Sequence, residues 1–412
     1  MNVHSADLTQ TDTKLCDDIA RRGDSLLADL TQYVAIPTGW NHTPGLDEIR
    51  GLVTGRLAAL GATVELTPGE PTAPDWLWRS GRADKPNTNL APIAVCKRCA
   101  GDGPKTLIAS HLDTVFDPAG DFQTLELSSD GGTGVGPGVV DMKGGLVIAI
   151  AALEALASAG VEASWTYLFN SDEEMGSYHS AAALRALAPD HVVGLCTEPA
   201  LPGGELAIER GGSGQFLIET VGKSAHVGRA FTEGVSAVTA LAEALVKIAA
   251  MPDPAGGRIV NVGPIEGGGA TNIVPDGARA WGNVRYAAPS IGEDLENMLD
   301  ALATEESALP GVRVRRSFNR PAKPLTPEVE RLAGLAQSCA TSLGQELPLA
   351  RTGGVCDGNI LQEAGLPTID TLGVRGGGLH THAEWIDISS LVERCQLFAL
   401  LLSRIAAGAL AG

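Results

Sequence analysis

Aromatic side chains and positive charge are both scarce in this chain of 412 residues. Only 4% of the residues are aromatic, and 30 lysines and arginines stand against 49 aspartates and glutamates, which gives a net charge of −19. A strongly acidic surface repels phosphate groups, so we expect neither a nucleic-acid partner nor a membrane partner. An anionic substrate would need local arginines to overcome the same repulsion.

Long hydrophobic runs are also missing. The longest apolar stretches, residues 146–153 and 397–402, fall far short of the roughly 20 residues that a membrane-spanning helix needs. Residues 1–22 contain no apolar segment of the kind that marks a secretory signal. We therefore expect no membrane span and no secretory signal.

The seven cysteines are scattered and odd in number, which argues against a framework of disulfides. Cys96 and Cys99 form one Cys-x-x-Cys pair, but a structural zinc site normally takes a second pair at a suitable spacing, and the sequence has none. We interpret both as ordinary thiols in a loop and expect a reducing, cytoplasmic location.

The hydrophobic fraction of 44% allows a large buried core, and the length argues for two domains. Short β-rich runs alternate with longer helical runs over the first half of the chain. This alternation predicts an α/β fold with a mainly parallel sheet covered by helices on both faces. The clearest strands are expected at 106–110, 165–169 and 192–196, and the helices at 14–35, 46–60, 144–159 and 180–187.

The pattern changes after about residue 207 and follows the order β-α-β-β-α-β. This order is that of the split-βαβ, ferredoxin-like sandwich. The expected strands are 215–221, 259–263, 279–286 and 312–318, and the expected helices are 235–250 and 291–302.

A helix at 328–343, a strand at 367–372 and a helix from residue 391 then resume the first pattern. A small α+β domain is therefore expected to be inserted into a larger α/β domain. The predicted boundaries are 1–209 and 322–412 for the two parts of the catalytic domain, and 210–321 for the insert.

Chemically active side chains follow the predicted strands, at the point where each strand ends. His111 and Asp113 follow the first strand, Glu173 and Glu174 the second, and Glu198 the third. Ligands bind outside the carboxyl ends of strands in open parallel sheets, so these side chains are expected along one rim. Singly, such an acid is more often a helix cap or a solvated loop residue. Their joint placement favours a shared site.

One imidazole among several carboxylates suits Zn²⁺, and also Co²⁺ or Mn²⁺. Asp141, which precedes the helix at 144, could be a further ligand or only a helix cap. There are more carboxylates than one ion needs, and a carboxylate shared between two ions would use them all. His380, near the C-terminus, offers a second imidazole.

Nine segments in this order resemble the M20 family of dinuclear zinc metallopeptidases, and within it the bacterial glutamate carboxypeptidases. The resemblance covers nearly the whole chain from about residue 25. The ordered set is highly specific, although each short piece is not. The segments are SHLDTV, GVVDMKGG, NSDEEMGS, TEP, GKSAHVG, TNIVPD, NVRYA, RTGG and HTHAEWIDIS.

The resemblance implies two Zn²⁺ ions per chain and a metal ligand at each of five positions. Asp141 would bridge the two ions. His111 and Glu198 would complete the site of one ion, and Glu174 and His380 that of the other.

The resemblance also implies roles beside the ligands. Glu173 matches the general base. Asp113 would accept the second N–H of the His111 imidazole and fix its orientation. The family has a cis peptide after the bridging aspartate, so one is expected at Asp141–Met142.

His380 is preferred to His382 as the ligand because the family histidine precedes an acidic-aromatic pair, here Glu384–Trp385. The spacing varies within the family. His382 is then interpreted as a residue of the rim.

His226, in the segment GKSAHVG, would be a surface-turn histidine from sequence alone. The resemblance implies instead that it stabilises the oxyanion in the active site of a partner subunit. This role implies a homodimer formed through the inserted domain.

The same resemblance implies contacts to a substrate with a free carboxylate. Arg285 matches an arginine that grips the carboxylate, where a bidentate fork is apt, and Asn272 an asparagine of the same pocket. Arg351, with Gly353 and Gly354, matches a loop near the substrate. Either arginine could instead form a surface ion pair.

We therefore expect a zinc carboxypeptidase that removes a C-terminal amino acid, glutamate first, from a peptide or N-acyl conjugate. The alternative on the same scaffold is an N-acyl-amino-acid or N-acyl-diamine deacylase. Two departures leave the side-chain preference open. Cys356 stands where the glutamate carboxypeptidases have a hydroxyl residue, and Arg210 has no clear counterpart. A non-catalytic binding protein is disfavoured by the complete ligand set and by Glu173.

Overall fold

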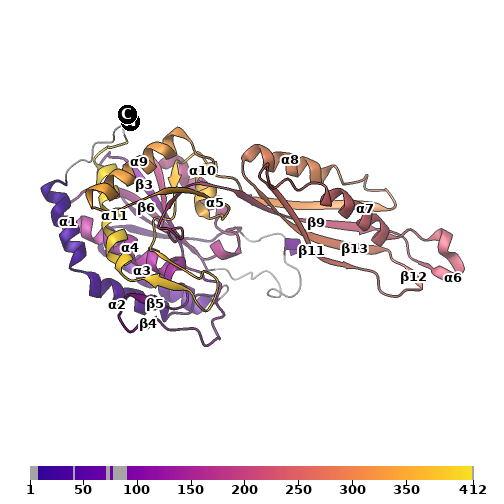
Figure 1. Ribbon diagram of the computed structural model, residues 1–412, viewed down its shortest axis with the longest axis horizontal. Coiled ribbons are helices and arrows are strands. Elements are labelled where there is room, and N and C mark those ends of the chain that lie inside the picture. The colour runs from indigo at the N-terminus through magenta and orange to yellow at the C-terminus, as the bar shows by residue number, and fades with distance from the viewer. Residues whose placement is uncertain (1–7, 40–41, 71–74, 78–90, 411–412) are drawn as a thin grey trace.

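The computed structural model describes residues 8–39, 42–70, 75–77 and 91–410. The chain forms a large lobe from its N- and C-terminal parts and a narrower small lobe from its middle part (Figure 1). The small lobe extends away from the large one, so the molecule is elongated. No helix among these residues combines the length and apolar character that a membrane span requires.

A six-stranded sheet in the order β1-β2-β6-β3-β7-β16 runs through the large lobe. The last four strands of this order are parallel, while β1 and β2 are antiparallel and form one edge. The predicted mixed, mainly parallel sheet is confirmed, although the edge strands were not predicted. The strands are β1 (Thr63–Thr67), β2 (Ile93–Arg98), β3 (Lys105–His111), β6 (Ser164–Asn170), β7 (Val193–Cys196) and β16 (Thr368–Ile369).

Helices cover both faces of this sheet, which explains why β3 and β6 are apolar along nearly their whole length. Helix α4 (Gly144–Ser158) is almost entirely buried because α1, α2, α3 and α11 all pack against it. Helices α5 (Ala181–Leu187) and α10 (Asp357–Glu363) belong to a second cluster on the other face. The remaining large-lobe helices are α1 (Gln10–Ala20), α2 (Gly23–Val34), α3 (Thr43–Ala59), α9 (Pro327–Ser342) and α11 (Ser389–Ala406).

Two local predictions were wrong. The single helix expected at 14–35 is two helices, α1 and α2, separated by a turn at Arg21–Arg22 that lets both pack against α4. Cys96 is buried within strand β2 rather than in a loop, and Cys99 is exposed just beyond the strand.

The small lobe has its own antiparallel sheet in the order β11-β13-β9-β14. Helices α7 and α8 pack on one face, where Phe216, Ile218 and Leu295 belong to a separate core. The chain order is the expected β-α-β-β-α-β, while the exact boundaries at 210 and 321 stay a prediction. The elements are β9 (Gly212–Val221), α7 (Ala237–Ala249), β11 (Arg258–Gly267), β13 (Gly277–Tyr286), α8 (Pro289–Asp300) and β14 (Gly311–Arg320).

Shorter elements shape the ends of both lobes. At the far tip of the small lobe, β10 (Ala225–His226) pairs with β12 (Ile273–Val274) beside α6 (Val227–Ala230). In the large lobe, β8 (Leu206–Arg210) pairs with β15 (Leu349–Thr352). A further sheet in the order β17-β18-β5-β4 joins β17 (Gly376–Gly377), β18 (Trp385–Asp387), β5 (Thr133–Val135) and β4 (Glu126–Leu127).

The chain passes between the lobes twice, and the two crossings lie side by side. Arg210 and Lys323 exchange two backbone hydrogen bonds of 2.9 Å each. The buried Asn359 side chain of α10 donates to the carbonyls of Gly211 and Pro321, at 3.0 and 2.7 Å. The two crossings are therefore held to each other and to α10 of the large lobe.

Candidate active site

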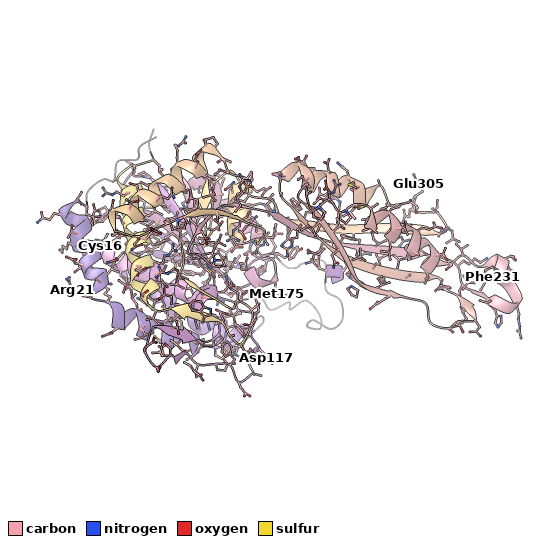
Figure 2. The ribbon with its side chains drawn as sticks, in the orientation of Figure 1. Cys16, Arg21, Asp117, Met175, Phe231 and Glu305 are labelled. Carbon is pink, nitrogen blue, oxygen red and sulfur yellow. The ribbon has the colours of Figure 1, made fainter. Side chains whose placement is uncertain are left out.

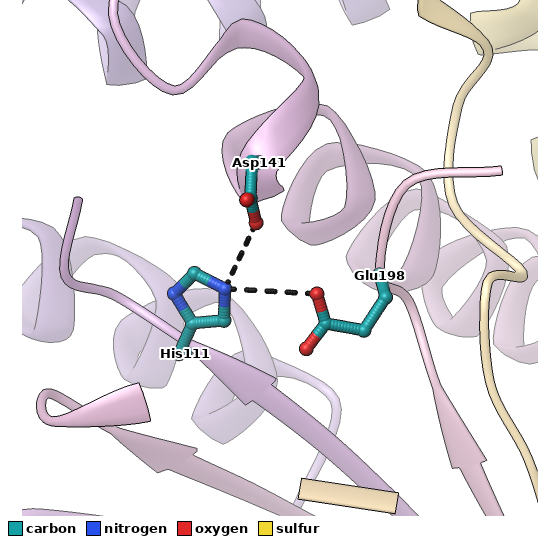
Figure 3. Close-up of side chains that lie close together, drawn as sticks. All are labelled: His111, Asp141 and Glu198. Atoms are coloured by element: carbon teal, nitrogen blue, oxygen red, sulfur yellow. Dashed lines mark hydrogen bonds and ion pairs between the residues drawn. The ribbon is translucent and has the colours of Figure 1, made fainter. Parts of the chain in front are cut away.

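Two groups of metal-ligating side chains meet at Asp141. One group is His111, Asp141 and Glu198, and the other is Asp141, Glu174 and His380. In the first, His111 Nε2 lies 3.1 Å from Asp141 Oδ1 and 3.8 Å from Glu198 Oε2 (Figure 3). In the second, His380 Nε2 lies 3.3 Å from Asp141 Oδ2 and 3.2 Å from Glu174 Oε2. The two oxygens of one carboxylate therefore face two different imidazoles.

The topology of the sheet brings these residues together. His111 is the last residue of β3, Glu174 lies four residues after β6 ends, and Glu198 lies just after β7. Because β3, β6 and β7 are parallel, their carboxyl ends share one edge of the sheet. His380 reaches the same edge from the loop between β17 and β18. The predicted rim is therefore present in the structure.

The backbone at Asp141 is held by an acid from a distant part of the chain. Glu384 Oε1 accepts hydrogen bonds from the N–H groups of Val140 and Asp141, at 3.0 and 3.1 Å. The peptide bond Asp141–Met142 is cis, as expected from the resemblance. Glu384 is fully buried, and the sequence analysis used it only to choose between two histidines.

Asp113 contacts His111 differently from the expectation. His111 Nδ1 lies 2.9 Å from the backbone carbonyl of Asp113 but 3.6 Å from its carboxylate. The carboxylate instead accepts the N–H groups of Glu173 and Glu174, at 3.2 and 3.0 Å. Asp113 therefore orients the imidazole through its main chain and anchors the Glu173–Glu174 segment through its side chain.

Of the two C-terminal histidines, His380 joins the ligand groups. Its backbone has a positive φ of 63°, which turns the chain at that residue. His382 stacks on Phe122, with 5.0 Å between ring centroids. The choice of His380 over His382 therefore agrees with the geometry.

The side chains present fit a divalent cation. Burial raises the pKa of Glu174 to about 7, and the nearby Asp141 adds to the effect. Burial likewise raises the pKa values of Glu173 and Glu198. So many buried carboxylates are costly without compensating positive charge, which a metal ion supplies. Carboxylates with imidazoles are the donor set that Zn²⁺, Co²⁺ and Mn²⁺ accept.

Glu173 belongs to neither ligand group, unlike its neighbour Glu174. Its carboxylate is held by Arg320, with Arg320 Nη2 at 2.7 Å from Glu173 Oε1. Burial is the largest influence on the pKa of Glu173 and raises it, while Arg320 acts to lower it. The sequence analysis missed Arg320, because no local motif marks it.

A cavity of about 530 Å³ opens beside the ligand groups, between the lobes. Glu173, Glu174 and His380 line it from the large lobe, while Gln215 and Arg285 line it from the small one. Arg285 is half-buried, and this burial lowers its pKa. Arg285 has no acidic partner among the residues that the structure describes, so its charge is available to a ligand.

The other expected substrate contacts divide into two sets. Gly354 lines the same cavity, and its carbonyl accepts a hydrogen bond from Arg210 at 3.1 Å. Gly353 and Arg351 are exposed next to it, and Arg351 forms a surface ion pair with Glu209 at 3.4 Å. Arg210 itself is buried and paired with Asp370 at 2.7 Å. The buried Cys356 precedes α10.

His226 and Asn272 lie together at the tip of the small lobe. The N–H of Val227, next to His226, donates to the Asn272 carbonyl at 2.9 Å. This tip is the end of the small lobe farthest from the large lobe (Figure 1). Figure 2 shows the separation: Met175, the residue that follows Glu174 in the sequence, is labelled in the large lobe, and Phe231 is labelled at the tip. Within one chain, therefore, neither His226 nor Asn272 reaches Asp141 or Arg285.

A two-lobed α/β fold with two groups of potential metal ligands at the carboxyl ends of its strands is the arrangement of a metal-dependent enzyme. The chain belongs to peptidase family M20/M25/M40, whose sequence profile it matches over residues 107–404. It is 28% identical to carboxypeptidase G2 of Pseudomonas sp. over 93% of this chain and 90% of that protein. It is also 28% identical to a succinyl-diaminopimelate desuccinylase of Sphingopyxis alaskensis, over 90% and 96% of the two chains. Among solved structures, a tripeptidase from Staphylococcus aureus superposes with a TM-score of 0.74 at 22% identity, over 93% and 99% of the two chains.

Glu384 offers a test of how the site is held. Replacing Glu384 with Ala removes the acceptor for two N–H groups at Asp141, so we expect the affinity for a divalent cation to fall by about 10- to 100-fold. Glu384→Gln keeps an acceptor oxygen and should lose less. Titration of the metal-free protein with Zn²⁺ against a chelating indicator measures both. Unchanged affinity in Glu384→Ala would show that the Asp141 loop holds its shape without this side chain.

Proposed function

We propose that the protein is a dinuclear zinc carboxypeptidase that releases a C-terminal amino acid, glutamate first, from a peptide or N-acyl conjugate. The observation that carries the proposal is the pair of ligand groups sharing Asp141, with Glu173 beside them and not among them. Asp141 would bridge two Zn²⁺ ions. His111 and Glu198 would complete one site, and Glu174 and His380 the other.

Bound ions supply a water of lowered pKa and polarise the scissile carbonyl. The residues of this chain carry the remaining work. Glu173 accepts the proton of the attacking water and returns it to the nitrogen of the leaving amine. Arg285 pairs with the carboxylate of the substrate, since it is the half-buried cation of the cavity without an acidic partner among the described residues.

The position of His226 supports a homodimer formed through the small lobe. A C2 pair would let each tip approach the partner's cavity, and such isologous dimers are the commonest oligomers. The partner's His226 would then stabilise the oxyanion, and the partner's Asn272 would contact the substrate. The tip is distant from its own cavity, so the lobes must also close before turnover.

The second candidate is deacylation of an N-acyl amino acid or N-acyl diamine. It is supported by the desuccinylase relative, which matches at the same identity as carboxypeptidase G2. Both reactions break an amide near a carboxylate, so the ligand groups serve either one.

A substrate panel separates the two candidates. We expect the Zn²⁺-loaded protein to hydrolyse N-acyl-glutamate with a higher kcat/KM than N-acetyl-ornithine or N-succinyl-diaminopimelate, because the charge of Arg285, unpaired among the described residues, attracts carboxylates and repels the free ammonium group that both diamine conjugates carry. The measurement is amine release from each compound at equal concentration. A preference for either diamine conjugate would favour the deacylase, and no turnover of any amide would refute both candidates.

The neighbours Glu173 and Glu174 should differ in phenotype. Glu173→Gln removes the proton acceptor but no ligand, so we expect kcat to fall by at least about 10²-fold while two metals per chain are retained. Glu174→Gln should lower the metal content to about one per chain, because it removes a ligand of one group only. Metal analysis beside steady-state kinetics measures both. Exchanged phenotypes would reverse the assignment.

Two inactive variants together should test the trans-acting histidine. His226→Ala should lower kcat by about 10²–10³-fold, the usual cost of one oxyanion donor, with metal content unchanged. When His226→Ala and Glu173→Gln subunits are mixed, one site of each mixed dimer has its own Glu173 and receives an intact histidine. Activity should therefore return, up to one working site per mixed dimer. Confirmed subunit exchange without activity would contradict the role in trans.

A further inference from the structure

The end of strand β14, which belongs to the small lobe, holds the loop that carries Glu173. Arg320 Nη2 donates to the Glu173 carboxylate at 2.7 Å, to the Glu173 carbonyl at 3.1 Å and to Ser177 Oγ at 2.8 Å. The preceding residue, Asn319, donates from its side chain to the carbonyl of Gly176. Two successive residues of one lobe thus bind a five-residue segment of the other.

A β-bulge aims Arg320 at this loop. Along β14, Ser317 is opposite Gln215 of β9, but the next pair is Arg320 with Ser213, so β14 has one extra residue. In a regular strand, residue 319 would lie opposite Ser213 and face the cavity with Gln215. The extra residue shifts the alternation, so that Arg320 is paired with Ser213, and both Asn319 and Arg320 line the cavity.

The loop itself has a conformation that needs outside support. Gly176 and Ser177 both have positive φ angles, of 97° and 52°. This region is uncommon for residues other than glycine and costs free energy unless the surroundings enforce it. Ser177 Oγ is bonded by Arg320 and donates to Asp357, the first residue of α10. Contacts from both lobes therefore hold the loop in this conformation.

We propose that Arg320 is a positioning residue for the general base: through the bulge of β14 it fixes the Glu173 carboxylate and makes its orientation depend on the placement of the small lobe. This inference rests on the proposed role of Glu173. It adds that the catalytic carboxylate is held from the lobe that must move, rather than only from the sheet that carries it.

A direct contact to substrate is the competing role for an arginine in this cavity. Arg320 is only 3% exposed, and both of its terminal nitrogens already face protein oxygens, Nη1 through Asp357 Oδ1 at 2.8 Å. Arg285 is half-buried and lacks such partners among the described residues. The geometry therefore assigns the substrate carboxylate to Arg285 and the catalytic loop to Arg320.

The test compares Arg320→Met, Arg320→Lys and Asn319→Ala with Arg316→Met as the matched control. Arg316 lies on the same strand and also pairs with two acids, Asp300 and Glu296, but on the outer surface. For Arg320→Met we expect kcat to fall by about 10²-fold with KM within about threefold of wild type, the pattern of an interaction that matters in the transition state. Arg320→Lys should recover part of the loss, and Arg316→Met should resemble wild type.

A double-mutant cycle with Glu173→Gln tests whether Arg320 acts through the base. Residues that act as a unit are strongly non-additive, so Arg320→Met should change the residual rate of Glu173→Gln by less than about threefold. If Arg320→Met does not fold, Asn319→Ala serves the same cycle, because it releases Gly176 without leaving a buried acid unpaired. We expect it to lower kcat by about threefold to tenfold with KM unchanged.

The outcomes are distinct. A KM raised tenfold or more with kcat retained would make Arg320 a substrate-binding arginine and overturn the inference. If the effects of Arg320→Met and Glu173→Gln on kcat were fully additive, Arg320 would have a structural role that is independent of Glu173. That result would also overturn the inference. Either result leaves the wild-type amidase activity standing. Only a wild-type protein that hydrolyses no amide would remove the proposed function, and the inference with it.

Discussion

The two oxygens of the Asp141 carboxylate are the constraint on which the rest of the site depends. One oxygen faces His111 and the other faces His380. The remaining acids therefore divide between these two sides, with Glu198 beside His111 and Glu174 beside His380. Burial alone would raise the pKa of Asp141, but hydrogen bonds from the two imidazoles hold it below its ordinary value. A second buried acid, Glu384, fixes the backbone at this point from almost the other end of the chain. The N- and C-terminal parts of the large lobe must therefore pack together before the site exists.

The many acids around the site also determine which arginines remain free to bind a substrate. The chain has a net charge of −19, and most arginines near the cavity are already committed to acids. Arg210 pairs with Asp370, and Arg320 pairs with Glu173 and Asp357. Arg285 is different among the described residues of the cavity, because only burial acts on its pKa. An acidic protein can bind an anionic substrate at such a point without attracting anions over its whole surface.

The sequence was sufficient to predict those parts of the site that lie at the ends of regular strands. Residues at strand ends, such as His111 and Glu198, were predicted to meet because parallel strands end at a common edge. Arg320 could not be found this way, because one extra residue in β14 reverses the alternation and a bulge leaves no clear sequence signal. The Asp113 contact was misjudged for a related reason, since the choice between its carbonyl and its carboxylate depends on a loop conformation. The break between α1 and α2 likewise depends on how both helices pack against α4.

The position of the bulge links any movement between the lobes to the loop that carries Glu173. The chain crosses between the lobes at Gly211 and Pro321, and Arg320 is the residue immediately before the second crossing. Any rotation of the small lobe about these crossings must either carry the Glu173–Ser177 loop with it or break the hydrogen bonds of Arg320 and Asn319. Because the loop is also tied to the large lobe through Asp113 and Asp357, it cannot follow freely. In the dimer proposed above, closure would therefore change the surroundings of the Glu173 carboxylate while it brings the partner's histidine toward the substrate.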